Sequence, residues 1–121
     1  MNADDLSQQP IVWVGSSHKD LRTFPSEVRR DIGFALYEAQ LGGRHYNVKP
    51  LKGFPGVMEI VSDYRTDTYR AVYAVKLGDE IYVLHVFQKK SKRGIATPKK
   101  ELDIIRQRLQ EATRIAREQK Q

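Results

Sequence analysis

Hydrophobic positions along the chain form short runs and helical stripes that together predict a mixed α+β fold. The first run, residues 11–14, is stopped by Gly15 and suits a buried strand, because four residues are too few for a stable helix. Between residues 18 and 41 the apolar positions recur at helical spacing. Pro25 divides this stretch, so we expect a short helix followed by a longer one that stops at the two glycines 42–43.

The middle of the chain has the composition of strands. Three segments rich in Val, Ile and Tyr follow a loop, residues 42–56, that contains six Gly or Pro. The predicted strands are residues 57–63, 69–76 and 81–88. Because their separators are short, an antiparallel meander is the economical topology.

A last helix is predicted after Thr97 and Pro98, which supply a cap and a first-turn proline. Its apolar stripe consists of Leu102, Ile105, Leu109, Ala112 and Ala116. The expected order is therefore strand, two helices, three strands and helix, with an N-terminal edge strand and with helices packed on the sheet. We expect residues 1–10 to be a disordered leader and residues 11–121 to form a single domain.

Composition narrows the class of protein. The chain of 121 residues has no Cys, which excludes disulfide scaffolds, thiolate zinc sites and Cys nucleophiles and fits a reducing compartment. Its start lacks the basic and apolar regions of a secretory signal, and no apolar run approaches the length of a membrane span. These features predict a cytoplasmic protein without a membrane partner.

Positive charge is concentrated in the last third of the chain. Residues 85–121 contain 11 Lys or Arg and 4 Asp or Glu, whereas residues 1–84 contain 10 and 11, within a formal net charge of +6. Such an asymmetry is typical of a localised surface that binds a polyanion.

Arg70 is the first candidate for chemistry. The period of two along its strand places Tyr69 and Ala71 on one face and Arg70 and Val72 on the other. An arginine there is costly to desolvate unless an anion or a carboxylate meets its donors. A phosphate contact and a structural pair with Glu59 on the adjacent strand are both open.

The second candidate is the end of the last strand, where His85 precedes the four cations Lys89, Lys90, Lys92 and Arg93. Such a cluster is suited to holding a phosphate chain, although basic clusters also occur as solvated turns. His85 has an unperturbed pKa near working pH and is a candidate general acid or base, although a lone strand His is more often a packing residue.

The Gly- and Pro-rich loop adds Lys49 and Lys52, cations that can lie near a site. The remaining histidines, His18 and His45, have no metal-ligand spacing, and no phosphate-binding glycine motif is present. We therefore expect neither a metal nor a cofactor.

Four segments resemble the phage-derived, HigB-like branch of the RelE/ParE toxin superfamily. These are VMEIV (57–61), DTYRAVY (67–73), YVLHVFQKKSK (82–92) and GIATP (94–98). The resemblance covers roughly residues 10–115, and the predicted order of elements is also that of the compact RelE-like fold.

The resemblance implies the toxin of a type II toxin–antitoxin system, an endoribonuclease that cleaves mRNA on the ribosome without a metal. Its implied partners are mRNA, the ribosome and a helix-turn-helix antitoxin. Arg70 matches the strand arginine that contacts the scissile phosphate in RelE-like toxins, and Lys89 and Lys90 match a basic pair after the last strand. Lys52 lies in a loop where some members have another basic residue.

Together these considerations select Arg70, His85, Lys89 and Lys52 as candidate catalytic residues. The candidate RNA-binding residues are Lys49, Lys89, Lys90, Lys92 and Arg93. Two other functions share the fold and stay open: a ParE-like toxin that inhibits DNA gyrase, and a phage RNA-binding module without catalysis. A homo-oligomer and a toxin–antitoxin hetero-oligomer are likewise both open.

Overall fold

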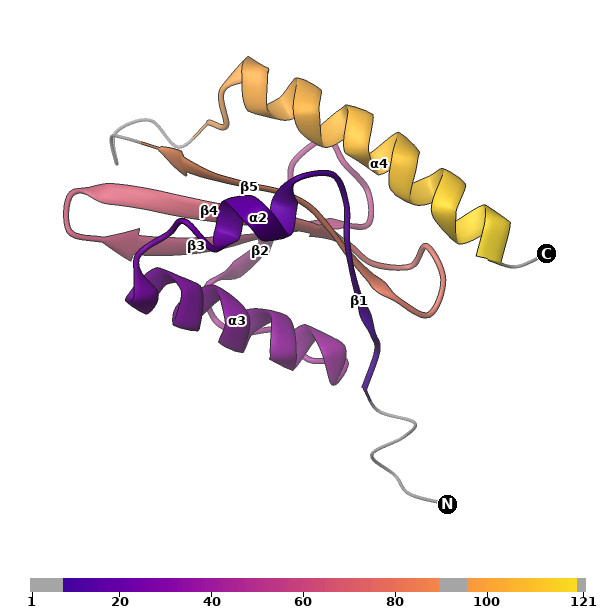
Figure 1. The fold of residues 1–121 in the computed structure, drawn as a ribbon, viewed down its shortest axis with the longest axis horizontal. Helices are drawn as coiled ribbons and strands as arrows, with labels where there is room; N and C mark the ends of the chain where they lie inside the picture. Colours follow the sequence, from indigo (N-terminus) through magenta and orange to yellow (C-terminus); the bar gives the residue numbers. More distant parts are fainter. Residues whose placement is uncertain (1–7, 90–95, 120–121) are drawn as a thin grey trace.

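The apolar runs pair into one five-stranded sheet in the computed structural model, which describes residues 8–89 and 96–119 (Figure 1). The spatial order of the strands is β1-β5-β4-β3-β2. The strands are β1 (Ile11–Trp13), β2 (Val48–Pro50), β3 (Val57–Tyr64), β4 (Asp67–Ala74) and β5 (Ile81–Lys89). The three long strands β3, β4 and β5 form the predicted antiparallel meander.

The N-terminal strand β1 lies at one edge of the sheet, as expected, and pairs with β5 in parallel. Two residues that the sequence places in the leader are attached to this fold. The Gln9 N–H donates to the Gln40 carbonyl at 2.9 Å, and the Ile81 N–H donates to the Pro10 carbonyl at 2.8 Å. The hydrogen-bonded part of the chain therefore begins before β1.

Helices cover both faces of the sheet (Figure 1). The short helix α2 (Ser17–Leu21) and the helix α3 (Ser26–Gln40) are separated at Pro25, as the sequence predicts. On one face of the sheet, the buried residues of α3 pack against Ile60, Ala71 and Tyr73 of the central strands. This face forms the first hydrophobic core.

The helix α4 (Lys99–Gln119) packs on the opposite face, where it meets Val57, Val72, Tyr82 and Leu84. Its predicted stripe is confirmed, because Ile105, Ala112 and Ala116 are buried and the two leucines pack beside them. The helix begins at Lys99, whereas the sequence predicts Thr97 as the cap and Pro98 as the first helical residue. The Thr97 hydroxyl donates to the Glu59 carboxylate and does not cap the helix.

The prediction of a structureless loop over residues 42–56 is wrong at one place. Residues 48–50 form β2, which pairs antiparallel with β3 at the far edge of the sheet. The strand was missed because only Val48 is buried, so it has no alternating pattern. None of the helices within residues 8–89 and 96–119 has the length and apolarity needed to span a lipid bilayer.

Candidate active site

Polar side chains gather on the sheet face that carries α4. In β4, Tyr69 and Ala71 belong to the core under α3 while Val72 belongs to the core under α4, so the intervening Arg70 points to the α4 side, as predicted. In β3, Glu59 lies opposite Val72 and shares this face. Arg70 and Glu59 are thus diagonal neighbours on adjacent strands.

A β-bulge in β5 brings His85 to the same face. Tyr73 pairs with Val83 and Val72 pairs with His85, so Leu84 is an extra residue in the ladder. Strict alternation from Tyr82 would turn His85 toward α3. The bulge therefore aligns Glu59, Val72 and His85 in one row across three strands.

Glu59 is the centre of the polar cluster. Its carboxylate is almost fully buried and accepts a hydrogen bond from Arg70 Nη1 at 3.0 Å. Lys49 Nζ lies 3.9 Å from Oε1, and the Thr97 hydroxyl donates to Oε2 at 3.4 Å. The Arg70–Glu59 pair that the sequence left open is present. A buried carboxylate and a buried guanidinium stabilise each other here.

This cluster opens into a pocket of about 430 Å³ between β2, the loop that follows it and the start of α4. Its lining residues are Lys49, Pro50, Leu51, Lys52, Glu59, Ala96, Thr97 and Leu102. The pocket has two lysines on its wall, one carboxylate at its base and Arg70 directly behind that carboxylate. This arrangement can bind a phosphate group and accept a proton beside it.

The structure brings together most of the predicted residues that it describes. Lys49 and Lys52 line the pocket, and Arg70 contacts its base through Glu59. Lys89 Nζ donates to the carbonyl of Ala96, another lining residue, at 3.1 Å. Three further candidates, Lys90, Lys92 and Arg93, lie outside the described residues.

His85 is held in a separate network under α4. Its Nε2 lies 2.7 Å from Glu101 Oε1, and its Nδ1 lies 3.4 Å from Arg108 Nη1. An arginine can only donate, so Nδ1 is the acceptor and Nε2 carries the proton for Glu101. Both ring nitrogens are therefore engaged, and His85 does not line the pocket.

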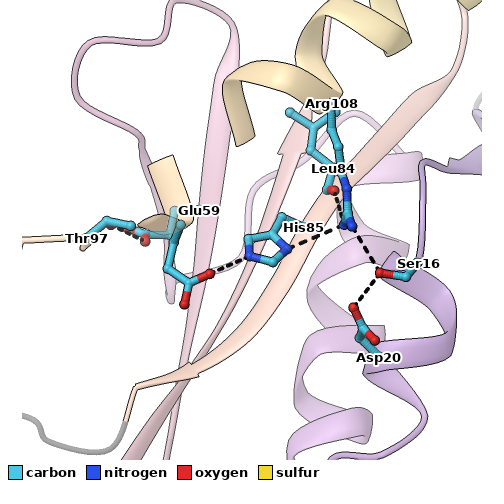
Figure 2. Close-up of polar contacts among 8 residues, drawn as sticks. Ser16, Asp20, Glu59, Leu84, His85, Thr97 and Arg108 are labelled. Atoms are coloured by element: carbon cyan, nitrogen blue, oxygen red, sulfur yellow. Dashed lines mark hydrogen bonds and ion pairs between the residues drawn. The ribbon is translucent and has the colours of Figure 1, made fainter. Parts of the chain in front are cut away.

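Arg108 ties this network to the N-terminal half of the chain (Figure 2). Its guanidinium donates to the Leu84 carbonyl and to the Ser16 hydroxyl, each at 3.0 Å, and Ser16 in turn donates to Asp20 at 2.7 Å. Leu84 is the extra residue of the β-bulge, so Arg108 binds a backbone carbonyl of the bulge itself. Gly15 has a φ of +57°, and a Cβ there would lie 2.7 Å from Arg108 Nε, so a larger residue would strain the backbone and displace the guanidinium.

Burial lowers the pKa of His85, and this effect outweighs the hydrogen bond and the charge of Glu101, which raise it. The folded chain therefore binds a proton at His85 less readily than the unfolded chain. The imidazole is neutral at neutral pH, in agreement with its acceptor role toward Arg108.

This pKa shift predicts a loss of stability in acid. As the pH falls below about 6.5, the ordinary pKa of His, the unfolded chain takes up the proton first and the free energy of unfolding decreases. In His85→Gln this contribution should be absent, so its stability should fall less between neutral and mildly acidic pH. Urea titrations at several pH values measure this difference. Equal pH dependence in the two proteins would contradict the prediction, and His18→Gln, an exposed-histidine variant, serves as the control.

Within residues 8–89 and 96–119, no group of three His, Cys, Asp or Glu side chains is arranged to hold a metal ion. The polar cluster instead combines one carboxylate with several cations.

Comparison with known proteins identifies the family of this chain. The family model described as phage derived protein Gp49-like (DUF891) matches residues 19–110. The chain belongs to the Gp49-like family. The Gp49-like match includes β2, the central strands and most of α4, and hence every described residue of the pocket. No curated protein gives a significant match.

The Gp49-like chain also shares its fold with a solved toxin. A free-state structure of Escherichia coli toxin RelE, in which two arginines are replaced by alanine, superposes with a TM-score of 0.60. It is 21% identical, and the match covers 84% of this chain and 98% of that one. The predicted RelE-like α+β fold is thereby confirmed.

Sequence reasoning missed three contributors. Glu59 was considered only as a partner for Arg70, although a lone carboxylate within the apolar segment 57–61 is as unusual as the arginine. Glu101 and Arg108 have the appearance of ordinary surface charges on a helix. The orientation of α4 about its own axis turns both side chains toward β5, and the sequence does not reveal this orientation.

Proposed function

We propose that this Gp49-like protein is the toxin of a toxin–antitoxin pair, and that it is an endoribonuclease which cleaves mRNA on the ribosome without a metal. Family membership and the RelE-like fold support the toxin assignment. A helix-turn-helix antitoxin is the partner that this assignment implies, and the cytoplasm is where such a toxin acts.

One observation carries the enzymatic part of the proposal. The pocket places the buried carboxylate of Glu59 beside two lysines and one arginine. Cleavage of RNA by its own 2′-hydroxyl requires a proton acceptor, cations for the phosphoryl oxygens and a proton donor for the leaving 5′-oxygen. Side chains of these three kinds are available at a single pocket.

In this mechanism Glu59 takes the proton from the 2′-hydroxyl as that oxygen attacks the adjacent phosphorus. Lys49 and Lys52 contact the phosphoryl oxygens, and Arg70 holds the carboxylate in place and adds positive charge behind it. A lysine ammonium of the pocket protonates the departing 5′-oxygen. The products are a 2′,3′-cyclic phosphate and a 5′-hydroxyl.

His85 acts in this scheme as a positioning residue. Its bond to Glu101 fixes the first turn of α4, whose next residue, Leu102, forms a wall of the pocket. Lys89, at the end of β5, and the basic residues that follow it in the sequence up to Arg93 supply further contacts to RNA phosphates.

Purified protein, ribosomes and an end-labelled mRNA, with EDTA in excess, test the proposal. We expect cleavage in the presence of EDTA, with a cyclic phosphate on the upstream fragment. Association with RNA without cleavage would identify a binding module. If induction in cells causes DNA damage before any break in mRNA, the gyrase-inhibiting alternative is correct.

The basic segment gives a second measurable prediction. Replacing Lys89 and Lys90 with Gln should weaken ribosome binding and flatten its salt dependence, because each lost phosphate contact removes roughly 0.7 to 0.9 from the log-log slope. Sedimentation with ribosomes at several salt concentrations measures the slope. A control variant, Lys19→Gln with Lys76→Gln, removes two exposed lysines, one in α2 and one in the connection between β4 and β5, and should keep the parent slope. If both variants behave alike, the segment is not the RNA-binding surface.

A further inference from the structure

The outer face of α3 carries an apolar stripe that the proposed function does not use. Phe34, Tyr37 and Leu41 are 55%, 50% and 44% exposed, and they are three of the four large hydrophobic side chains that are exposed among the described residues. Figure 1 shows the sheet on one side of α3 and no helix or strand over its other side. Exposed apolar surface of this kind marks an interaction site.

The spacing of this stripe is that of a helix-pairing surface. Glu27, Arg30, Phe34, Tyr37 and Leu41, which we name the α3 seam, follow one another at alternating intervals of three and four residues. This is the spacing of the a and d positions at which two helices interlock their side chains. A partner that matches the α3 seam is therefore another helix.

We propose that the α3 seam joins two copies of this chain in a symmetric dimer, with the two α3 helices antiparallel. In antiparallel pairing the a positions of one helix pack against the d positions of the other. Phe34 then packs on the partner's Tyr37 in the two central layers, and Leu41 is covered by the aliphatic stem of the partner's Arg30. The apolar part of the seam is thus buried by its own symmetry mate.

Charge selects a second copy and its antiparallel orientation. Glu27 lies at one end of the α3 seam, and the exposed Arg44 follows its other end. An antiparallel pair brings each Glu27 to the end where the partner's Arg44 lies, whereas a parallel pair would place like charges together. The surface is therefore complementary to itself.

A glycine inside α3 supports a close contact. Gly33 is exposed, has no positive φ, and a Cβ added there would meet nothing within 4 Å. Glycine is a poor helix former, and nothing in the single chain requires it. Gly33 flanks the seam between Arg30 and Tyr37, where it lets a partner helix approach closely.

The dimer leaves the candidate active site open. The pocket with Glu59 lies on the face of the sheet that carries α4, opposite α3, so each copy presents its pocket outward. Dimer formation therefore does not depend on the proposed ribonuclease activity.

Sedimentation equilibrium of the purified full chain over a wide concentration range tests the proposal. We expect the average mass to rise from one chain to two. Phe34→Glu should raise the dissociation constant by more than about tenfold, because it places carboxylates in both central layers. Gln110→Glu on the exposed side of α4 is the matched control and should dimerise as the parent does. A parent that stays at the mass of one chain, or a Phe34→Glu variant that dimerises normally, would overturn the proposal.

Three further variants test the geometry with readouts that do not depend on loss of folding. Gly33→Leu should weaken the dimer while raising the melting temperature of the dilute monomer, because the helix gains a better helix former. Glu27→Arg should also weaken the dimer, and adding Arg44→Glu should restore it. A Gly33→Leu variant that dimerises as the parent does, or a charge-swapped pair that does not regain the parent affinity, would contradict the antiparallel seam.

Discussion

Glu59→Gln is expected to reduce mRNA cleavage by about 10²- to 10⁴-fold, the usual contribution of a general base. The amide has the size of the carboxylate and can still accept hydrogen bonds from Arg70 and Thr97, but it cannot take the proton of the 2′-hydroxyl. Single-turnover cleavage of ribosome-bound mRNA measures the loss. Circular dichroism should show a folded protein, and growth arrest on induction should disappear.

Asp63→Asn is the matched control for this experiment. Asp63 is an exposed carboxylate on the same strand, and it does not line the pocket. Removing the charge of Asp63 should leave the cleavage rate unchanged. If Glu59→Gln cleaves at the parent rate, the carboxylate is structural and the base must be sought elsewhere. Lys52 would then be the next candidate for a proton acceptor.

The long elements could be predicted from the sequence because each buries one face. The stripe of α4 and the alternation in the strands are periodic signals that depend on local positions only. By contrast, β2 buries one side chain in three and leaves no periodic signal. The parallel pairing of β1 with β5 depends on contacts between residues 11–13 and 81–83, which no local pattern specifies.

The candidate site was predictable in part. An arginine amid apolar strand residues implies a buried partner or ligand, so Arg70 and its pairing with Glu59 could be anticipated. The pocket could not, because Lys49 and Lys52 reach Glu59 only through the pairing of β2 with β3. His85 could not be placed either. One extra residue in β5 turns it toward α4 and into bonds with Glu101 and Arg108.

Arg70→Ala is expected to abolish cleavage and to lower the free energy of unfolding by roughly 3 to 5 kcal/mol, because it leaves the Glu59 carboxylate buried without its main partner. Arg70→Lys should recover part of the stability but little activity. An ammonium restores the charge without the planar set of donors that holds the carboxylate. Urea unfolding and cleavage assays on the same preparations measure the two effects.

A double substitution separates the structural and catalytic parts of this pair. Replacing Glu59 with Leu and Arg70 with Met exchanges a buried ion pair for apolar side chains, a change that is often neutral or stabilising in proteins. We expect the double variant to recover the parent stability and to remain inactive, because the proton acceptor and the adjacent cation are both gone. Cleavage by this well-folded double variant would show that the pair only holds β3 and β4 together, and the mechanism proposed for the pocket would then be wrong.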